Sequence, residues 1–206
     1  MAVSFHLIGF RSILDAQNKS WKTGMEIKVR DLFYIDFEAS SLSAESWPIE
    51  IGIAWIDGAS VQSWSTLIRP DASWDLEDWS AQSAKVHNIP YEEVMAAPRA
   101  IDVAHEVKAR LEGKTPVSDN PEFETRWMAK LLKLADTPSP EFLDYDLLAH
   151  SACHNHPAAL DRVYERLERT RVPHRAGKDA ERLAKGILRG LKVMREGEPS
   201  TAPDPA

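Results

Sequence analysis

Two acidic residues, Asp36 and Glu38, lie two positions apart at the end of the run Leu32–Glu38, which reads LFYIDFE. This run is rich in residues that favour β-strands, and residues i and i+2 of a strand face the same side. Two carboxylates on one side of a buried strand are unfavourable unless a cation neutralises them, and Mg²⁺ and Mn²⁺ prefer oxygen ligands. The pair therefore predicts a metal site. The alternative is a strand end with two solvated acids, which the apolar residues before Asp36 disfavour.

A second group of reactive residues lies near the C-terminus, in the segment His174–Asp179 (HRAGKD), between Pro173 and a helical pattern. A histidine can act as a general base near neutral pH. Asp179 falls in the first turns of the predicted helix, where an acidic residue also stabilises the helix dipole. The residues by themselves leave both roles open for Asp179.

Taken in chain order, these two groups and an acidic segment between them resemble the DEDDh exonucleases, also called DnaQ-like. The order is Asp36-x-Glu38, then the segment 117–124 (VSDNPEFE), which is similar to the family's second motif, and then His174-x4-Asp179. Each motif alone is common. Three of them in the correct order and spacing indicate the family.

The resemblance extends over about residues 32–190 and includes a histidine-containing turn at 86–89 (VHNI). It implies a ribonuclease-H-like fold, two Mg²⁺ or Mn²⁺ ions, and hydrolysis of terminal phosphodiester bonds from a 3′ end with release of nucleoside 5′-monophosphates. The implied substrate is single-stranded or short nucleic acid, DNA or RNA, and many relatives are homodimers. His174 would accept a proton from the attacking water, and His87 would be structural. The implied metal ligands are Asp36, Glu38, Glu124 and Asp179.

The middle motif departs from the family pattern, which has a His-Asn pair followed by Phe-Asp. Here Asp119 replaces the histidine before Asn120, and Glu124 replaces the aspartate after Phe123. The additional methylene of Glu124 shifts a ligand by about an ångström, and such a displacement costs on the order of 100-fold in rate. The register favours Glu124 as the middle carboxylate, and Asp119 stays the alternative.

The elements that must position these residues follow from periodicity and turn residues. Asp57-Gly58 predicts a tight β-hairpin. A hairpin followed by alternating helices and strands indicates an α/β domain with a mixed β-sheet, in which an antiparallel hairpin and parallel strands are flanked by helices. The expected strands are 32–38, 49–55, 61–68, 115–118 and 142–148, and the expected helices are 76–87, 91–95, 98–112, 121–134, 157–170 and 178–194.

The chain of 206 residues fits one exonuclease domain at 31–195. Residues 1–30 show no periodicity and are expected to be an N-terminal extension, part of which translation from Met25 would remove. The tail at 196–206 is rich in Pro, Glu and Ser and is expected to be disordered. Cys153 is the only cysteine, which excludes an internal disulfide and favours a cytoplasmic protein. Because no apolar run reaches the roughly 18 to 20 residues of a membrane span, no membrane partner is expected.

Charge is unevenly distributed along the chain. The formal net charge is −7, but residues 161–195 hold eleven Lys and Arg against five Asp and Glu, a balance of +6 that leaves −13 for the rest. A basic face beside an acidic, metal-loaded pocket suits a nucleic-acid substrate. Two solvated helices of mixed charge are an equally simple interpretation of this segment.

Two further groups carry weaker expectations. The segment Cys153–His156 (CHNH) looks like a metal cluster but lacks the remaining ligands of a zinc site, so it is expected to precede the helix from Pro157. Trp47, in the loop after Glu38, is the tryptophan best placed to stack on a terminal base.

Three functions fit these observations. The first is a metal-dependent 3′→5′ exonuclease. The second is a catalytically weakened DnaQ-like module that binds nucleic acid or a protein, which the substitutions at 119 and 124 favour and the intact D-x-E and H-x4-D pairs disfavour. The third is a metal-dependent phosphatase that acts on small nucleotides.

Overall fold

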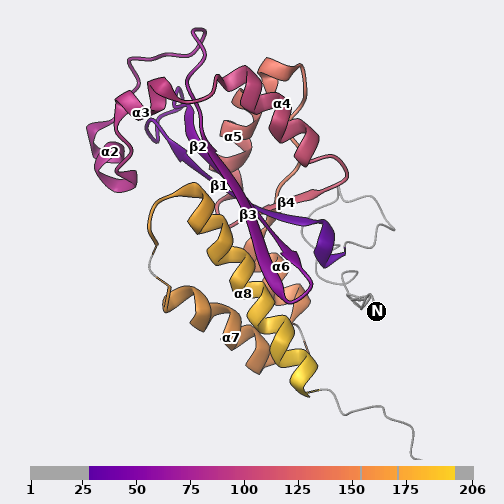
Figure 1. Cartoon of the computed structure of the whole chain (residues 1–206). Helices are drawn as coiled ribbons and strands as arrows, with labels where there is room; N and C mark the ends of the chain where they lie inside the picture. Colours follow the sequence, from indigo (N-terminus) through magenta and orange to yellow (C-terminus); the bar gives the residue numbers. More distant parts are fainter. Residues whose placement is uncertain (1–27, 154, 171, 198–206) are drawn as a thin grey trace, which may run out of the picture.

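The structure, a computed structural model, describes residues 28–153, 155–170 and 172–197. Its centre is a five-stranded sheet in the order β3-β2-β1-β4-β5 (Figure 1). β1 pairs antiparallel with β2 and parallel with β4, and β4 pairs parallel with β5. The predicted mixed sheet, with an antiparallel hairpin beside parallel strands, is confirmed. The strands are β1 (Leu32–Ala39), β2 (Pro48–Asp57), β3 (Ser60–Leu67), β4 (Thr115–Ser118) and β5 (Leu143–Asp144).

Helices cover both faces of this sheet, as the sequence predicts (Figure 1). α4 and α5 pack on one face, and α6, α7 and α8 contribute to the core on the other. The α-helices are α2 (Ala81–His87), α3 (Tyr91–Ala96), α4 (Ala100–Arg110), α5 (Pro121–Leu132), α6 (Tyr145–Ala152), α7 (Pro157–Glu168) and α8 (Ala176–Gly197). Two short 3-10 helices are η1 (Val29–Asp31) and η2 (Lys133–Ala135).

Alternate residues of the central strand β1 face two different cores. Ile35 and Phe37 pack in the core that contains α4 and α5, whereas Tyr34 packs in the core that contains α8. Because successive side chains of a strand point to opposite faces, Asp36 and Glu38 lie on the same face as Tyr34. The two acids therefore face α8.

The predicted hairpin turn between β2 and β3 is confirmed. β2 ends at Asp57, and Gly58 has a φ of 59°, a conformation that a residue without a Cβ adopts at little cost. β3 begins at Ser60 and pairs antiparallel with β2 from Asp57 back to Glu50. The turn thus places the tryptophan-containing strands side by side at one edge of the sheet.

The predicted strand at 142–148 is wrong over most of its length. β5 comprises only Leu143–Asp144, and helix α6 begins at Tyr145. The cause is local, because the side chain of Asp144 accepts a hydrogen bond of 2.9 Å from the backbone N–H of Leu147. An aspartate in this position caps a helix and ends the strand.

The helix predicted at 76–87 is also too long. α2 begins at Ala81, because the hydroxyl of Ser80 accepts a hydrogen bond of 3.2 Å from the backbone N–H of Ser83 and caps the helix there. The residues before Ser80 form turns rather than helix.

The ends of the chain lie mostly outside the described residues, so the expected extension at 1–30 and tail at 196–206 stay predictions. Of the first segment, Val29 and Arg30 belong to η1, and of the second, residues 196 and 197 belong to α8. In the described part of the chain, none of the helices has the length and apolar character needed to cross a bilayer.

Candidate active site

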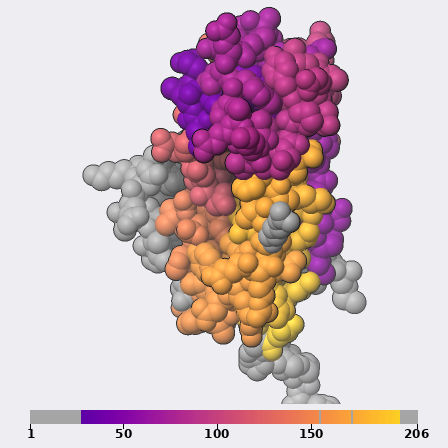
Figure 2. Space-filling model, turned by 90° about the vertical axis from the view of Figure 1, so that its left-hand side faces the viewer, coloured from indigo at the N-terminus to yellow at the C-terminus, as the bar shows by residue number. Residues whose placement is uncertain are grey.

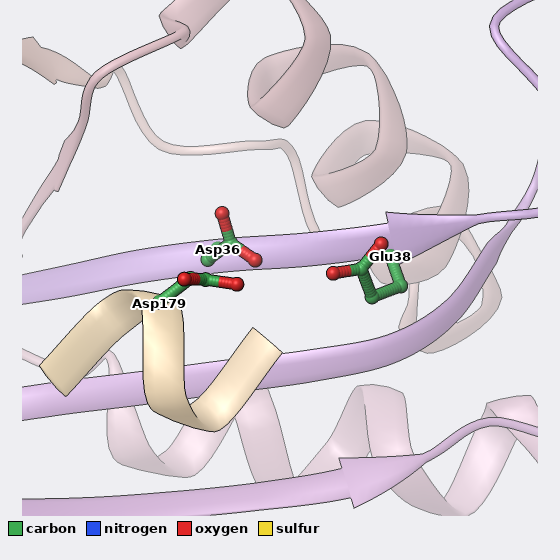
Figure 3. A group of neighbouring side chains, drawn as sticks. All are labelled: Asp36, Glu38 and Asp179. Carbon is green, nitrogen blue, oxygen red and sulfur yellow. The ribbon is translucent and has the colours of Figure 1, made fainter. Parts of the chain in front are cut away.

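The central strand and the last helix bring three carboxylates together. Asp36 and Glu38 project from β1, and Asp179 projects from the first turn of α8 (Figure 3). One oxygen of each carboxylate lies within 4.8 Å of the other two. Asp36 and Glu38 are half-buried and Asp179 is buried. The D-x-E pair and the aspartate of the H-x4-D group therefore converge, although most of the domain separates them along the chain.

Two glycines allow the first turn of α8 to lie directly on the sheet. A Cβ at Gly52 in β2 would lie 2.1 Å from the carbonyl oxygen of Ala176, and a Cβ at Gly177 would lie 2.7 Å from Oγ of Ser65 in β3. Real Cβ atoms essentially never approach other heavy atoms within 3.0 Å. The absence of both side chains therefore sets how closely Asp179 approaches the strands.

An ion pair between a buried carboxylate and a partly exposed guanidinium holds the same end of α8. Glu50 of β2 has a side chain only 4% exposed and accepts hydrogen bonds from Nε and Nη2 of Arg175, at 3.0 and 2.9 Å. It also accepts one of 3.1 Å from the backbone N–H of Ala176. A bidentate guanidinium–carboxylate pair fixes orientation as well as distance. Since Glu50 lies directly opposite Glu38 in the sheet, the pair ties the helix end to the acidic cluster.

Neither member of this ion pair is among the site residues that the sequence predicts. A signal was present, because Glu50 is the one charged residue in the run 48–56 (PIEIGIAWI). An acid in an apolar strand requires a partner. Its partner follows His174 in the chain, but nothing in the sequence pairs the two segments.

His174 stands where the chain turns into α8. Its φ of 53° lies in the left-handed region, which few residues other than glycine adopt. The imidazole is exposed and lines a pocket of about 390 Å³ together with Asp36, Glu38 and Asp179. Burial raises the pKa of Asp179, and the backbone N–H of Arg175 and the charge of His174 oppose that rise. His174 therefore lines the same pocket as the three carboxylates.

Burial and mutual repulsion oppose ionisation of the acidic cluster. The pKa of Glu38 is raised to about 8, mainly by burial and also by Asp179 and Glu50, against the opposing charge of Arg175. Burial, followed by the charge of Glu38, raises the pKa of Asp36 well above its ordinary value. Several carboxylates in one partly dry pocket are stable as anions only beside a compensating cation.

The two candidates for the middle carboxylate occupy different positions. Glu124, in the first turn of α5, is buried, and its Oε2 has no hydrogen-bond partner among the described residues. Burial and the neighbouring charge of Asp36 raise its pKa well above the ordinary value. Asp119, just beyond β4, is exposed and lines the pocket. Neither belongs to the group of three carboxylates whose oxygens all lie within 4.8 Å of one another.

The residues present fit a divalent cation. The donors are carboxylate oxygens, which Mg²⁺ and Mn²⁺ prefer. In the described part of the chain, Oδ1 of Asp179 and Oε2 of Glu124 are buried acceptors without a hydrogen bond. Buried acceptors normally have a partner, and a cation would satisfy them. Asp36, Glu38 and Asp179 are the residues that would hold it, with Glu124 or Asp119 as the fourth.

Two other residues singled out in the sequence, Trp47 and His87, do not line the pocket. Trp47 is fully buried, and its indole N–H donates to the carbonyl of Asp75, so the expectation that it stacks on a substrate base is wrong. His87 is buried, its Nδ1 accepts a hydrogen bond from the backbone N–H of Ile89, and this fits a structural role.

The segment Cys153–His156 precedes helix α7, as expected. Cys153 is buried and ends α6, and His156 stands immediately before Pro157, the first residue of α7. His154 lies outside the described residues. Of the residues that the structure describes, none in this segment joins a group able to hold a metal ion.

The mixed sheet, with acids on its central strand and a helix packed across them, defines a ribonuclease-H-like nuclease. The model of the exonuclease family RNase_T matches residues 33–186. The chain therefore belongs to this exonuclease family, whose ribonuclease-H-like members include the DnaQ-like, or DEDDh, enzymes. A comparison with curated protein sequences found no match.

Solved structures with a similar fold include exonucleases. A 3′-exonuclease, in a structure described as 3′-end specific recognition of histone mRNA stem-loop, has a TM-score of 0.60 and 14% identity over 81% of this chain and 84% of that one. Escherichia coli exonuclease I, in complex with a dA16 oligonucleotide, has a TM-score of 0.58 and 12% identity over 80% of this chain and 43% of that one. Exonuclease X, in complex with 5′ overhanging duplex DNA, has a TM-score of 0.53 and 20% identity over 79% of this chain and 92% of that one. At these identities the similarity establishes the fold.

Proposed function

We propose that the protein is a metal-dependent 3′→5′ exonuclease that hydrolyses terminal phosphodiester bonds of single-stranded or short nucleic acid and releases nucleoside 5′-monophosphates. The observation that carries the proposal is the convergence of Asp36, Glu38 and Asp179 within 4.8 Å, beside an exposed His174 on the wall of the same pocket. Membership of the exonuclease family and the fold shared with 3′-exonucleases support it.

The residues of the pocket have separate roles in this reaction. Two bound Mg²⁺ or Mn²⁺ ions would supply charge stabilisation for the attacking and leaving oxygens. Asp36, Glu38 and Asp179 are the residues that would hold these cations. His174, which is exposed and lines the pocket, accepts the proton of the attacking water, a role that an imidazole nitrogen can fill. The Glu50–Arg175 ion pair keeps His174 and Asp179 in register with β1.

A labelled-substrate experiment tests this proposal. Single-stranded DNA and RNA with a 5′ label are incubated with the protein in Mg²⁺, Mn²⁺ or EDTA, beside Asp36→Ala and His174→Ala. We expect a ladder that shortens from the 3′ end, requires the metal and is lost in Asp36→Ala. Glu112→Gln, an exposed acid at the end of α4, serves as the control and keeps full activity. Products cut from the 5′ end or internally would refute the proposed polarity.

The proposal assigns Glu124 as the fourth carboxylate, with Asp119 as the alternative. Support for Glu124 comes from its register in the motif and from its buried, unpartnered Oε2. Glu124→Asp is expected to raise the rate by about 100-fold, because it removes the methylene that displaces the carboxylate by about an ångström. Glu124→Gln is expected to abolish metal-dependent activity. If Asp119→Asn abolishes activity and Glu124→Gln does not, Asp119 is the ligand.

A second function is favoured by the position of the middle acid. Because neither Glu124 nor Asp119 lies in the group of three carboxylates, the chain also fits a weakened DnaQ-like module that binds nucleic acid without cutting it. Binding of a 5′-labelled strand, with no shortening in any metal and no gain from Glu124→Asp, would favour this module. Metal-dependent shortening by the wild-type protein would exclude it.

A further inference from the structure

A groove between α7 and α8 is lined by cations. It has a volume of about 380 Å³, and Figure 2 shows the two helices side by side in the lower half of the molecule, orange beside amber and yellow. Glu165 is the only acid among its lining residues. The lining cations are Arg162, Arg166, Arg169, Lys185, Arg189 and Lys192. The groove is thus strongly basic in a protein whose formal net charge is −7.

The spacing of these cations explains why they meet. On α7 they occupy positions 162, 166 and 169, and on α8 positions 185, 189 and 192. Both sets have the spacing i, i+4, i+7, which places side chains in one row along a helix. The two rows face each other because α7 packs against α8, where Val163 lies in the same core as Leu188.

The acids in and beside the groove leave most of this charge uncompensated. Glu165 forms ion pairs with Arg162 and Arg169, and Arg189 also lowers its pKa. Lys185 pairs with Glu181 at 2.6 Å. Within the described part of the chain, three cations of the groove form no ion pair, namely Arg166, Arg189 and Lys192.

The fold does not need the three cations that form no ion pair with the described residues, Arg166, Arg189 and Lys192. Like charges at i, i+4 weaken a helix slightly, and the buried contacts between α7 and α8 are made by apolar residues. Several arginines around an open groove create a positive potential that attracts phosphate, and arginine binds phosphate oxygens with two parallel hydrogen bonds. A ligand with several phosphates fits this arrangement.

The cationic face of α8 continues into the active-site pocket. Arg182 lines that pocket and precedes Lys185 by three residues. Lys185 and Lys192 follow Asp179 by six and thirteen residues, which is about 9 and about 20 Å along the helix axis at 1.5 Å per residue. At about 3.4 Å per stacked nucleotide, the groove lies about three to six nucleotides from the carboxylates.

We propose that this groove binds the phosphate backbone of the strand whose 3′ end lies in the active-site pocket. The inference rests on the proposed function, because it takes nucleic acid as the substrate. A nucleic acid fits better than a membrane, since the apolar residue of the groove, Leu188, is buried and offers no side chain for insertion into lipid. The groove would make the enzyme distinguish long strands from dinucleotides.

The test compares two double variants. Arg166→Gln with Arg189→Gln removes two cations from the groove, and Lys108→Gln with Lys133→Gln removes two exposed cations from the opposite face of the sheet as the control. A 15-nucleotide single strand with a 5′ fluorophore is titrated in EDTA at several salt concentrations, with fluorescence anisotropy as the readout. Because EDTA prevents hydrolysis, the result does not depend on whether the protein cuts.

The expected result follows from counterion release. Each phosphate contact with a single strand contributes about 0.7 to the slope of log K against log salt concentration. Over the tenfold range from about 1 M to about 0.1 M salt, one such contact therefore raises the affinity by about a factor of 5. The groove variant should therefore bind about 25-fold more weakly at 0.1 M salt, with a slope reduced by about 1.4. The control should bind like the wild type. Unchanged binding by the groove variant, or an equal loss in the control, would overturn the proposal.

Three further readouts distinguish the loss of strand binding at the groove from other effects of the substitutions. The groove variant should hydrolyse a dinucleotide as fast as the wild type does, but it should hydrolyse the 15-mer more slowly when the 15-mer is below saturating concentration. Equal slowing with both substrates would overturn the proposal. Loss of binding to vesicles rich in phosphatidylserine, or to an acidic peptide, without loss of binding to the strand would also overturn it. If the double variant is less stable than the wild type, Arg189→Gln alone should still weaken binding about 5-fold. Salt-dependent binding without hydrolysis would uphold the groove and refute the proposed exonuclease.

Discussion

Replacement of Gly52 by alanine tests how closely α8 must approach the sheet. The new Cβ would lie 2.1 Å from the carbonyl oxygen of Ala176, whereas ordinary contacts begin at 3.4 Å. The obstacle is backbone, so the first turn of α8 must withdraw by roughly 1.3 Å, the difference between these distances. Asp179 then moves away from Asp36 and Glu38.

The magnitude follows from two effects of that displacement. Misplacement of catalytic groups by about 1 Å costs about 100-fold in rate, and overpacking of a filled interior costs about 1–3 kcal/mol of unfolding free energy. We therefore expect Gly52→Ala to lose about two orders of magnitude in single-turnover hydrolysis of a 5′-labelled oligonucleotide. Urea denaturation should show the loss of stability.

A matched control distinguishes backbone from side-chain obstruction. A Cβ at Gly177 would meet only the side chain of Ser65, at 2.7 Å from Oγ. Gly177→Ala should therefore be rescued by Ser65→Gly, whereas no truncation of a side chain should rescue Gly52→Ala. Wild-type rate and stability in Gly52→Ala would refute the reasoning. Reduced stability with an unchanged rate in the folded protein would show that this contact does not position Asp179.

Three other predictions concern charge. Arg175→Ala removes two hydrogen bonds from the buried carboxylate of Glu50 and should lower the unfolding free energy, measured in urea, by about 3 kcal/mol. A loss of unfolding free energy below about 0.5 kcal/mol, which is the contribution of an exposed ion pair, would contradict this prediction. Because the pKa of Glu38 is raised to about 8, the metal-free protein should lose stability as the pH rises from 4.5 to 8. The increase in Tm that Mn²⁺ produces should be larger at pH 8 than at pH 6, because the metal then has fewer protons to displace. A smaller increase in Tm at pH 8 than at pH 6 would count against this prediction. Burial raises the pKa of Glu181, but hydrogen bonds, chiefly from Lys185, lower it to about 2. Glu181→Gln should therefore be less stable than the wild type at pH 7, and the difference should disappear as the pH falls from 4.5 to 2; a difference that persists at pH 2 would exclude this cause.

Local rules account for the parts of the fold that were predicted. The apolar run before Asp36 forms the central strand, and the period of two places Asp36 and Glu38 on one face. Asp57-Gly58 forms the turn because glycine adopts a positive φ at little cost. The strand predicted at 142–148 failed for a local reason too, since Asp144 caps a helix there and the apolar residues that follow belong to α6.

The sequence by itself determined which residues are available for chemistry, namely the D-x-E pair, the histidine before the last helix and Asp179. Only the tertiary structure decided how they meet. The ion pair between Glu50 and Arg175 joins β2 to α8, and the absence of a side chain at Gly52 lets the two elements pack closely. The two segments lie far apart in the chain, and neither carries a local signal for the other. Side-chain burial is decided in the same way, because it depends on which distant segments pack together, and so Trp47 lies in a core of other tryptophans instead of facing the pocket.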